Sequence, residues 1–233
     1  MKKALGVLTL LCSVNVVADS EISVNVGSFS VDGQDSGFAL DGDLDSFALN
    51  YRLGLTDALS LQFGYEERDG EFMLTTGEQT EYDATEVELL LSYKICASDT
   101  CGLAFEPYAG YRRFEGDNAL NAFGVAVNVA QERDEIPLGV VVSYTSGALE
   151  YGVDLGVGRK ISDKQLIPAL GVNQSSNKNW VSHFAIPVRY NVNEQFFVEF
   201  RYEMEAVKFS DGDGTRVARE ENEQFTFGAG FKF

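Results

Sequence analysis

Charged side chains recur at every second position of several segments whose other residues are large and apolar. Between positions 198 and 205 the order is Val-Glu-Phe-Arg-Tyr-Glu-Met-Glu. Successive side chains of a β-strand point to opposite faces, so these charges share one face. The residues that occupy such polar faces along the chain are Arg52, Glu66, Glu86, Glu88, Lys94, Glu106, Arg112, Asp154, Arg189, Glu199, Arg201, Glu203 and Glu205.

Two kinds of chemistry suit these charges if the segments enclose a common interior. Unpaired charges away from water are costly, so the side chains could form an ion-pair network that fills the interior. Alternatively they could line a polar channel, whose excess of carboxylates would favour cations. A barrel of about ten strands is near the size at which side chains still fill the lumen. We therefore expect a filled or narrowly open interior.

His183 is the only histidine of the chain, and it falls on the polar face of the segment from Trp180 to Tyr190. A histidine at the rim of an open interior could serve as a general acid or base. A lone histidine on such a face is more often structural. We therefore expect no catalytic site, and nothing in the sequence predicts a cofactor.

Cys96 and Cys101 flank a short connection, Cys-Ala-Ser-Asp-Thr-Cys. In an exported protein two such residues at the ends of paired strands predict a disulfide, of modest stabilising effect because the closed loop is short. Two free thiols are the alternative. A metal site is disfavoured because no histidine lies near. The run Asp41–Asp45 is no calcium loop either, since Ser46 and Arg52 stand where glycine and glutamate are needed.

The segment from Glu223 to Phe233 shows what the apolar faces would contact. Its aromatic residues alternate with small and polar ones. In water such a strand would promote aggregation. In a bilayer it would be one strand of a closed barrel, with its aromatic side toward lipid. This ending resembles the C-terminal signature of bacterial outer-membrane β-barrel proteins, whose terminal phenylalanine is read by the barrel-insertion machinery. The resemblance implies that machinery as a partner and implies no activity.

About ten such segments can be counted, and the connections between them alternate between long and short. A barrel with both termini in the periplasm has short periplasmic turns and long external loops. The predicted fold is thus an all-β, transmembrane antiparallel β-barrel of about ten strands. Residues 67–84, 114–134 and 159–179 are expected to be external loops, and a change of parity after Val26 predicts a β-bulge at Gly27-Ser28.

A secreted soluble barrel would also alternate, but its outer face would be rich in Lys and Glu. Here the polar faces are rich in Gly, Ser, Ala and Asn, which suits a narrow lumen. About ten residues separate Trp180 from Tyr190, and about ten tilted residues span the roughly 25 Å between the two aromatic girdles of an outer membrane. The expected girdle residues are Tyr51, Tyr93, Trp180, Tyr190, Phe231 and Phe233.

The first residues read as a secretory signal, with Lys2 and Lys3 before an apolar run. We expect cleavage after Ala18, which makes residues 1–18 a signal peptide and 19–233 the barrel. A lipoprotein is the alternative, but Leu11 stands where a small residue is needed before Cys12. The 233 residues carry a net charge of -18, and losing the two lysines makes it -20. That charge argues against nucleic acid as a partner.

Outer-membrane lipid and lipopolysaccharide are therefore the expected surroundings, in a Gram-negative envelope, and the oligomeric state stays open. The chain resembles small porin-like barrels over its mature length. The first functional hypothesis is a structural barrel, or one that passes small solutes or ions through a narrow polar lumen. The second is a surface interaction or adhesion protein acting through long acidic loops.

The third hypothesis is an outer-membrane hydrolase centred on His183. Omptin proteases place an Asp-His pair at the barrel rim, but the residue two positions before His183 is Val181. Lipid A deacylases use Ser with His, yet Ser182 and His183 are neighbours in sequence and point to opposite faces. No functional residue can therefore be carried over from either family.

Overall fold

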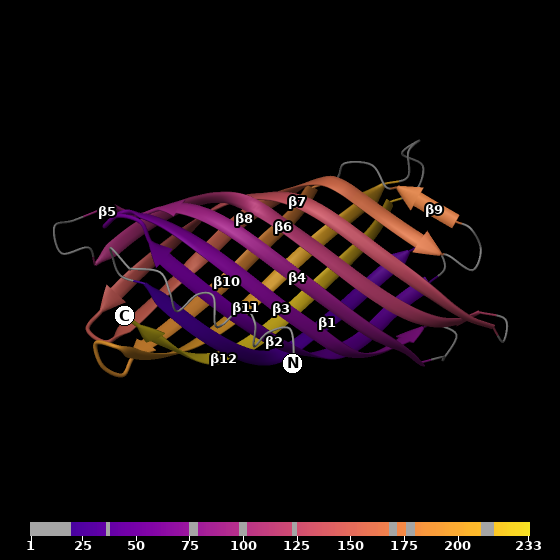
Figure 1. Cartoon of the computed structure of the whole chain (residues 1–233), viewed down its shortest axis with the longest axis horizontal. Coiled ribbons are helices and arrows are strands. Elements are labelled where there is room, and N and C mark those ends of the chain that lie inside the picture. The colour runs from indigo at the N-terminus through magenta and orange to yellow at the C-terminus, as the bar shows by residue number, and fades with distance from the viewer. Residues whose placement is uncertain are drawn as a thin grey trace.

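In a computed structural model of the chain, the strands form one barrel (Figure 1). The structure describes residues 20–35, 38–74, 79–97, 102–122, 125–167, 172–175, 180–210 and 217–233. These residues form ten long strands and two short ones, β5 (Ile95–Cys96) and β9 (Val172–Ser175). The long strands are β1 (Glu21–Asp35), β2 (Phe38–Gly54), β3 (Leu59–Leu74), β4 (Gln79–Tyr93), β6 (Leu103–Ala122), β7 (Val125–Ser146), β8 (Leu149–Ile167), β10 (Trp180–Asn191), β11 (Phe196–Ser210) and β12 (Val217–Lys232).

Each long strand pairs antiparallel with its neighbours, and the sheet closes on itself. β1 pairs with β12 from Glu21↔Lys232 to Gln34↔Arg219, and β10 pairs with both β8 and β11. Reciprocal backbone hydrogen bonds between Ser20 and Phe233 (3.2 and 2.9 Å) join the two ends of the described chain. Closure removes the unpaired strand edges that a membrane would not tolerate.

Short turns lie at the same end of the barrel as Ser20 and Phe233, which we call the terminal end. The hydroxyl of Thr56 accepts a hydrogen bond from the amide of Leu59 (2.9 Å), which closes the β2–β3 turn. Asn193 caps the β10–β11 turn in the same way. Gly147, between β7 and β8, has φ of 61°, a left-handed conformation that glycine adopts at little cost. The opposite end, which we call the distal end, carries the hairpins that extend furthest.

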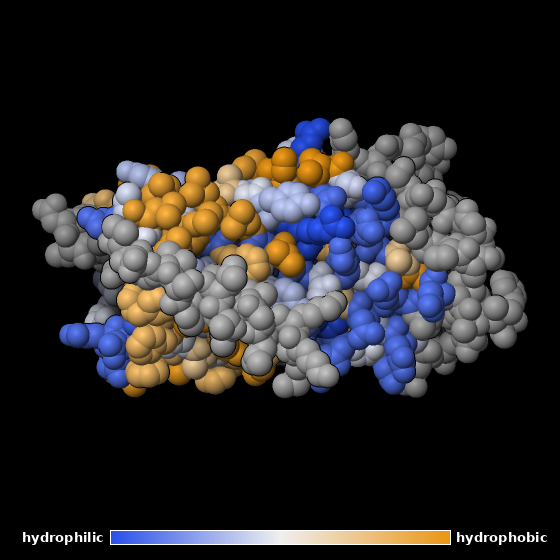
Figure 2. Space-filling model, in the orientation of Figure 1, coloured by the Kyte–Doolittle hydropathy of each residue, from blue (hydrophilic) through white to orange (hydrophobic). Residues whose placement is uncertain are grey.

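The outer surface changes from apolar to polar along the barrel, as β12 illustrates. Going up β12 from the terminal end, Phe233, Phe231, Ala229, Phe227 and Phe225 point outward, and Glu223 follows. Nine residues of a strand tilted by about 40° rise about 23 Å, close to the height of a membrane's apolar band. Figure 2 shows this division, with apolar side chains gathered over the terminal half and polar ones over the distal half. The apolar band is therefore the surface that contacts lipid.

Beyond this band, on β1 and β2, the polarity of the two faces is reversed. The expected bulge at Gly27-Ser28 is absent, because β1 keeps one continuous register with both β2 and β12 through these residues. Phe29 and Val31 consequently point inward, where they pack with Leu44 in a buried apolar cluster. The parity appeared to change because water, not lipid, surrounds this part of the barrel. Apolar side chains accordingly move to the inner face.

The long segments expected to be external loops are largely strand. β3 and β4 continue to Leu74 and from Gln79, and the β6–β7 hairpin extends to Ala122 and Val125. The barrel wall therefore rises well above the apolar band. A β-bulge does occur, opposite Asp134 and Glu135 of β7, where the register with β8 shifts at Ile161. This shift lets Lys160 and Asp163 both point inward, and they form a buried ion pair (2.9 Å).

Among the described residues, no helix is long and apolar enough to cross a membrane.

Candidate functional site

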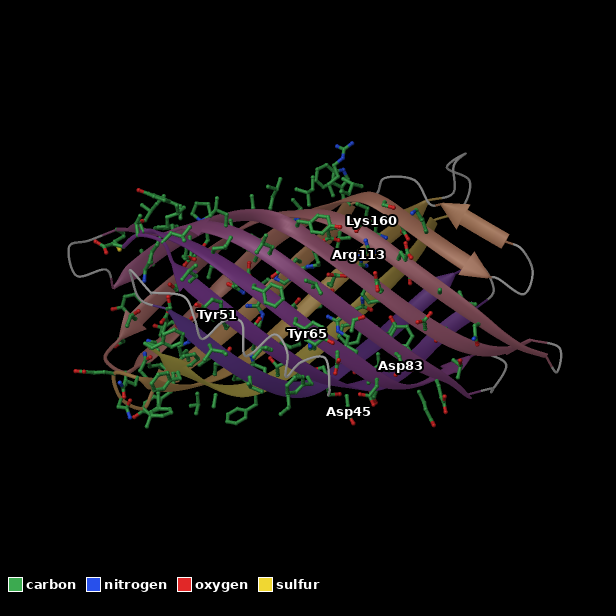
Figure 3. All side chains as sticks on the ribbon, in the orientation of Figure 1. Asp45, Tyr51, Tyr65, Asp83, Arg113 and Lys160 are labelled. Atoms are coloured by element: carbon green, nitrogen blue, oxygen red, sulfur yellow. The ribbon has the colours of Figure 1, made fainter. Side chains whose placement is uncertain are left out.

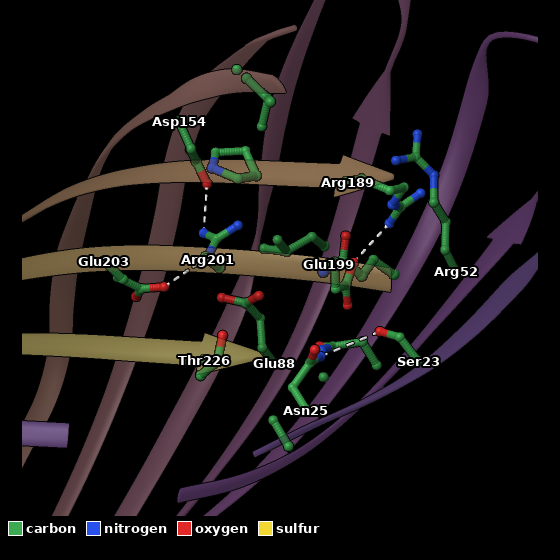
Figure 4. Close-up of a pocket in the computed structure, with 18 of the residues that line it drawn as sticks. Ser23, Asn25, Arg52, Glu88, Asp154, Arg189, Glu199, Arg201, Glu203 and Thr226 are labelled. Carbon is green, nitrogen blue, oxygen red and sulfur yellow. Dashed lines mark hydrogen bonds and ion pairs between the residues drawn. The ribbon is translucent and has the colours of Figure 1, made fainter. Parts of the chain in front are cut away.

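The lumen encloses a cavity of about 280 Å³ that is lined mainly by charged and polar side chains (Figure 4). Of the charges expected on the inner faces, all but two line this cavity. Glu205 also points inward and is engaged in ion pairs at the distal side of the cavity. Lys94 does not line the cavity and lies instead between β4 and β5, at the terminal end. The cavity charges form three groups, at successive heights.

At the terminal end, Arg189 of β10 closes the lumen. Its guanidinium donates to Glu21 of β1 (2.8 and 3.1 Å) and to Glu199 of β11 (3.1 Å). Phe197 points inward beneath it, with its ring 4.0 Å from the Arg189 guanidinium carbon, and is 1% exposed. An inward phenylalanine is unexpected on a polar face, and here it gives the arginine an aromatic surface to stack on. Arg52 and Glu106 form a second cross-strand pair nearby (2.6 Å).

The middle group surrounds His183. Its Nε2 lies 3.2 Å from Oδ2 of Asp154, and its Nδ1 lies 3.2 Å from Oε1 of Glu203. Arg201 donates to both of the same carboxylates (2.8 and 2.9 Å), as Figure 4 shows. Tyr108 donates to the other oxygen of Asp154 (2.9 Å). Each ring nitrogen of His183 thus lies within ion-pairing distance of a carboxylate, and the contact of Nε2 with Asp154 also has hydrogen-bond geometry.

The ring of Tyr108 lies over two glycines of the next two strands, Gly139 of β7, which is the register partner of Tyr108, and Gly156 of β8. A methyl group at Gly139 would overlap the Tyr108 hydroxyl. We expect Gly139→Ala to displace the ring, weaken its hydrogen bond to Asp154 and lower the free energy of unfolding by about 1–3 kcal/mol. Urea titration in detergent measures this. Gly64→Ala is the matched control, because its nearest neighbour would lie 3.4 Å away; an equal loss in both variants would contradict the proposed packing.

The distal group is centred on Arg112 of β6. Its guanidinium donates to Glu88 (2.7 and 2.9 Å), Glu135 (3.3 Å) and Glu205 (3.2 Å). Glu86 lies 3.2 Å from its Nε. Glu205 belongs to β11, across the lumen from β6, and it also binds Arg133 of β7 (3.2 Å). Arg112 therefore bridges the lumen.

Above this group, Arg68 links the ion pairs to the apolar cluster. It donates to both carboxylate oxygens of Glu66 (2.9 Å each), and its guanidinium carbon lies 4.1 Å from the centre of the Phe29 ring. Burial by itself would lower the pKa of Arg68, but the carboxylates of Glu66 and Glu86 raise the pKa above its ordinary value. Arg68 therefore stays charged inside the barrel.

Among the described residues, the inward charges that escaped the sequence interpretation include Glu21, Arg68, Arg133, Glu135, Glu150, Lys160 and Asp163. Arg68 and Arg133 lie in segments interpreted as loops, where no alternation was sought. Glu135 is 1% exposed and directly precedes Ile136, the first outward residue predicted for its strand. Extending the predicted strand toward the N-terminus would therefore have assigned Glu135 to the inner face. No group of three or more His, Cys, Asp or Glu among the described residues is arranged to hold a metal ion.

No family model and no curated protein matches the chain by sequence. Solved structures do match it over nearly its whole length. The outer-membrane protease OmpT from Escherichia coli has a TM-score of 0.61 at 14% identity, over 92% of this chain and 96% of that chain. The translocator domain of the autotransporter NalP from Neisseria meningitidis has a TM-score of 0.53 at 8% identity, over 100% and 95%.

This chain has the fold of a bacterial outer-membrane β-barrel. The predicted fold class, a closed antiparallel barrel of ten long strands, is confirmed. The lipid-facing apolar band places the barrel in the outer membrane, with its terminal end on the periplasmic side and its distal end outside the cell. At these identities the similarity concerns the fold alone.

The girdle residues of this outer-membrane barrel differ in exposure. Tyr93, Trp180, Tyr190 and Phe233 are about half exposed, whereas Tyr51 is 5% exposed and stacks on Phe233 (6.3 Å between ring centres). Phe231 packs edge-on against Phe196 (5.0 Å). Trp180 lies at the external edge of the band and the other five near the periplasmic edge.

The predicted disulfide, the signal peptide and one acidic turn lie wholly or partly outside the described residues. Cys96 of β5 is disulfide-bonded. Cys101 lies outside the described residues, as do residues 1–19 with the expected signal peptide and the turn from Asp211 to Gly214.

Proposed function

We propose that the protein is a structural outer-membrane barrel whose narrow polar lumen is held closed by ion pairs and admits at most small ions. The observation that carries this proposal is the bond between Arg112 and Glu205, residues 93 positions apart on strands that face each other across the lumen. An arginine held by four carboxylates has little freedom to swing aside. The Arg189 group gives a second barrier at the periplasmic end.

The charges that line the cavity would favour cations if the lumen were opened. Nine carboxylates line it, against four arginines and His183. Rings of carboxylates lower the barrier for cations and raise it for anions. Removing one bridging arginine therefore both widens the lumen and increases its negative charge.

We expect the purified protein in a planar bilayer to show no steps as large as those of an open water-filled porin in the same bilayer. Arg112→Ser is expected to add small, cation-selective openings, because it removes the cross-lumen bridge and leaves its carboxylates uncompensated. Arg113→Ser, an outward residue of the same strand, is the matched control. Large wild-type steps would contradict the closed lumen. Failure of both Arg112→Ser and the triple change Glu199→Ala, Glu203→Ala, Glu205→Ala to open a pathway would remove the channel role.

The second candidate is a surface interaction protein, and one observation favours it. Four outward aspartates lie directly opposite one another on adjacent strands above the band: Asp45↔Asp69, Asp69↔Asp83 and Asp83↔Asp117. All four are exposed, and Figure 3 shows Asp45 and Asp83 in the external half of the barrel. Like charges in register destabilise a sheet, so a row of them suggests selection for a surface property. Unchanged adhesion after Asp→Asn changes at all four would dismiss this role.

We infer that His183 is a structural residue, because both of its ring nitrogens lie 3.2 Å from carboxylates within the ion-pair network. We propose a positioning role for this residue, in which it holds Asp154 and Glu203 on neighbouring strands. A hydrolytic activity of the protein that survived His183→Ala would exclude this histidine from catalysis. An activity abolished by His183→Ala in a folded variant would contradict the positioning role.

We further propose that residues 1–18 are removed as a signal peptide and that β12 is the segment read by the insertion machinery. The role of β12 is supported by its alternating aromatic residues, which point outward over the full height of the band, and by its pairing with β1, which closes the barrel. A Phe233→Ser variant should accumulate unfolded in the periplasm.

A further inference from the structure

Arg159 occupies an unusual place on the lipid-facing surface. Going up β8 from the periplasmic end, the outward residues are Leu149, Tyr151, Val153, Leu155 and Val157, and then Arg159. It is therefore the first outward charge of its strand, directly at the external edge of the apolar band. Its side chain is exposed, whereas the Lys160 side chain points into the lumen, as a Cβ at Gly158 would also do.

The neighbours of Arg159 are apolar. Ile136 of β7 and Trp180 of β10 lie directly opposite it on the two adjacent strands. Its guanidinium carbon lies 5.4 Å from the centre of the Trp180 ring, and Trp180 is 51% exposed. Ile161, two residues further on, is 43% exposed. Arg159 and Trp180 thus form an outward cation–aromatic pair within an apolar surface, which we call the Arg159–Trp180 pair.

No carboxylate of the described residues pairs with Arg159. Arg113, the corresponding first outward charge of β6, lies 2.7 Å from Glu115 and 3.8 Å from Asp134. The acidic row formed by Asp45, Asp69, Asp83 and Asp117 occupies the strands β2, β3, β4 and β6, which are not neighbours of β8 or β10. An arginine at the edge of lipid is costly without a counter-ion, so an anion from outside the chain is expected there.

We infer that the Arg159–Trp180 pair binds a phosphate group of an outer-leaflet glycolipid. The fold places the pair where the phosphorylated sugars of such a lipid meet its acyl chains. Arginine recognises phosphate by paired, charge-assisted hydrogen bonds. The indole ring supplies a flat surface for the sugar or the first acyl carbons and holds the guanidinium in place. Ile136 and Ile161 provide the apolar surface on which acyl chains lie.

The test uses Trp180 as its own probe, since it is the only tryptophan of the chain. The folded barrel in a neutral detergent is titrated with a diphosphorylated lipid A, with the same lipid after removal of its phosphates, and with inorganic phosphate alone. A saturable change in tryptophan emission is expected with the phosphorylated lipid only. Arg159→Gln is expected to weaken the apparent affinity at least about tenfold, as the loss of charge-assisted bonds implies.

Arg113→Gln is the control, because that guanidinium already has carboxylate partners, and it should leave the titration unchanged. Heat-dependent electrophoretic mobility verifies that each variant is folded. An unchanged affinity in Arg159→Gln, an equal response to the dephosphorylated lipid, or no saturable response to the phosphorylated one overturns the inference. A response to inorganic phosphate alone at the same concentration shows a simple anion site and overturns the assignment to a glycolipid.

Discussion

Replacing Arg112 with methionine is expected to lower the free energy of unfolding by about 3–5 kcal/mol, the usual cost of removing one partner from a buried ion-pair network. The guanidinium contacts Glu86, Glu88, Glu135 and Glu205, and its side chain is 10% exposed. Without it, four carboxylates share a narrow lumen with less positive charge. Urea unfolding of the barrel in detergent micelles, followed by circular dichroism, measures the loss.

Two further variants separate the ion-pair effect from a packing effect. Arg52→Met removes a single pair with Glu106, and the Arg52 side chain is 30% exposed, so a loss below about 1 kcal/mol is expected. Combining Arg112→Met with Glu205→Gln and Glu135→Gln removes charge from both sides and should recover part of the stability. A full-sized loss in the combined variant, or a negligible one in Arg112→Met alone, would show that water already screens these charges.

Leu44→Ala is expected to cost about 2–5 kcal/mol, because Leu44 is 1% exposed inside the external part of the barrel and its removal leaves a cavity beside Phe29 and Val31. Leu91→Ala is the matched control: Leu91 lies on the outer face of β4 and is 48% exposed, where lipid fills the space of the lost methyl groups. The loss in free energy of unfolding is expected to be smaller for Leu91→Ala than for Leu44→Ala. Equal losses would contradict the reversal of polarity above the band.

Amide hydrogen exchange shows which part of the barrel Leu44→Ala destabilises. In Leu44→Ala, amide protection should fall first in the external halves of β1 and β2, which contribute the cluster, while the part within the apolar band stays protected. A uniform loss of protection along both strands would instead indicate that the two halves of the barrel unfold together.

How far the sequence could be interpreted is seen by comparing β12 with β1. In β12 every outward and inward residue of the lipid-facing part follows the alternation, because lipid outside and polar groups inside impose the same rule at each position. In β1 the same rule failed after Gly27. The environment of the outer face changes there from lipid to water, and alternation cannot show which medium a face meets.

The sequence by itself determined the lipid-facing barrel, through the aromatic final segment and the alternation of long and short connections, and the period of two determined which side of each strand faces the lumen within the apolar band. Only the tertiary structure decided which charges meet. Arg189 binds Glu21 across 168 positions, and Gln224 binds Glu66 across 158. Such pairs depend on the register and tilt of ten strands taken together. A one-residue shift in any of them would bring different side chains to the same height in the lumen.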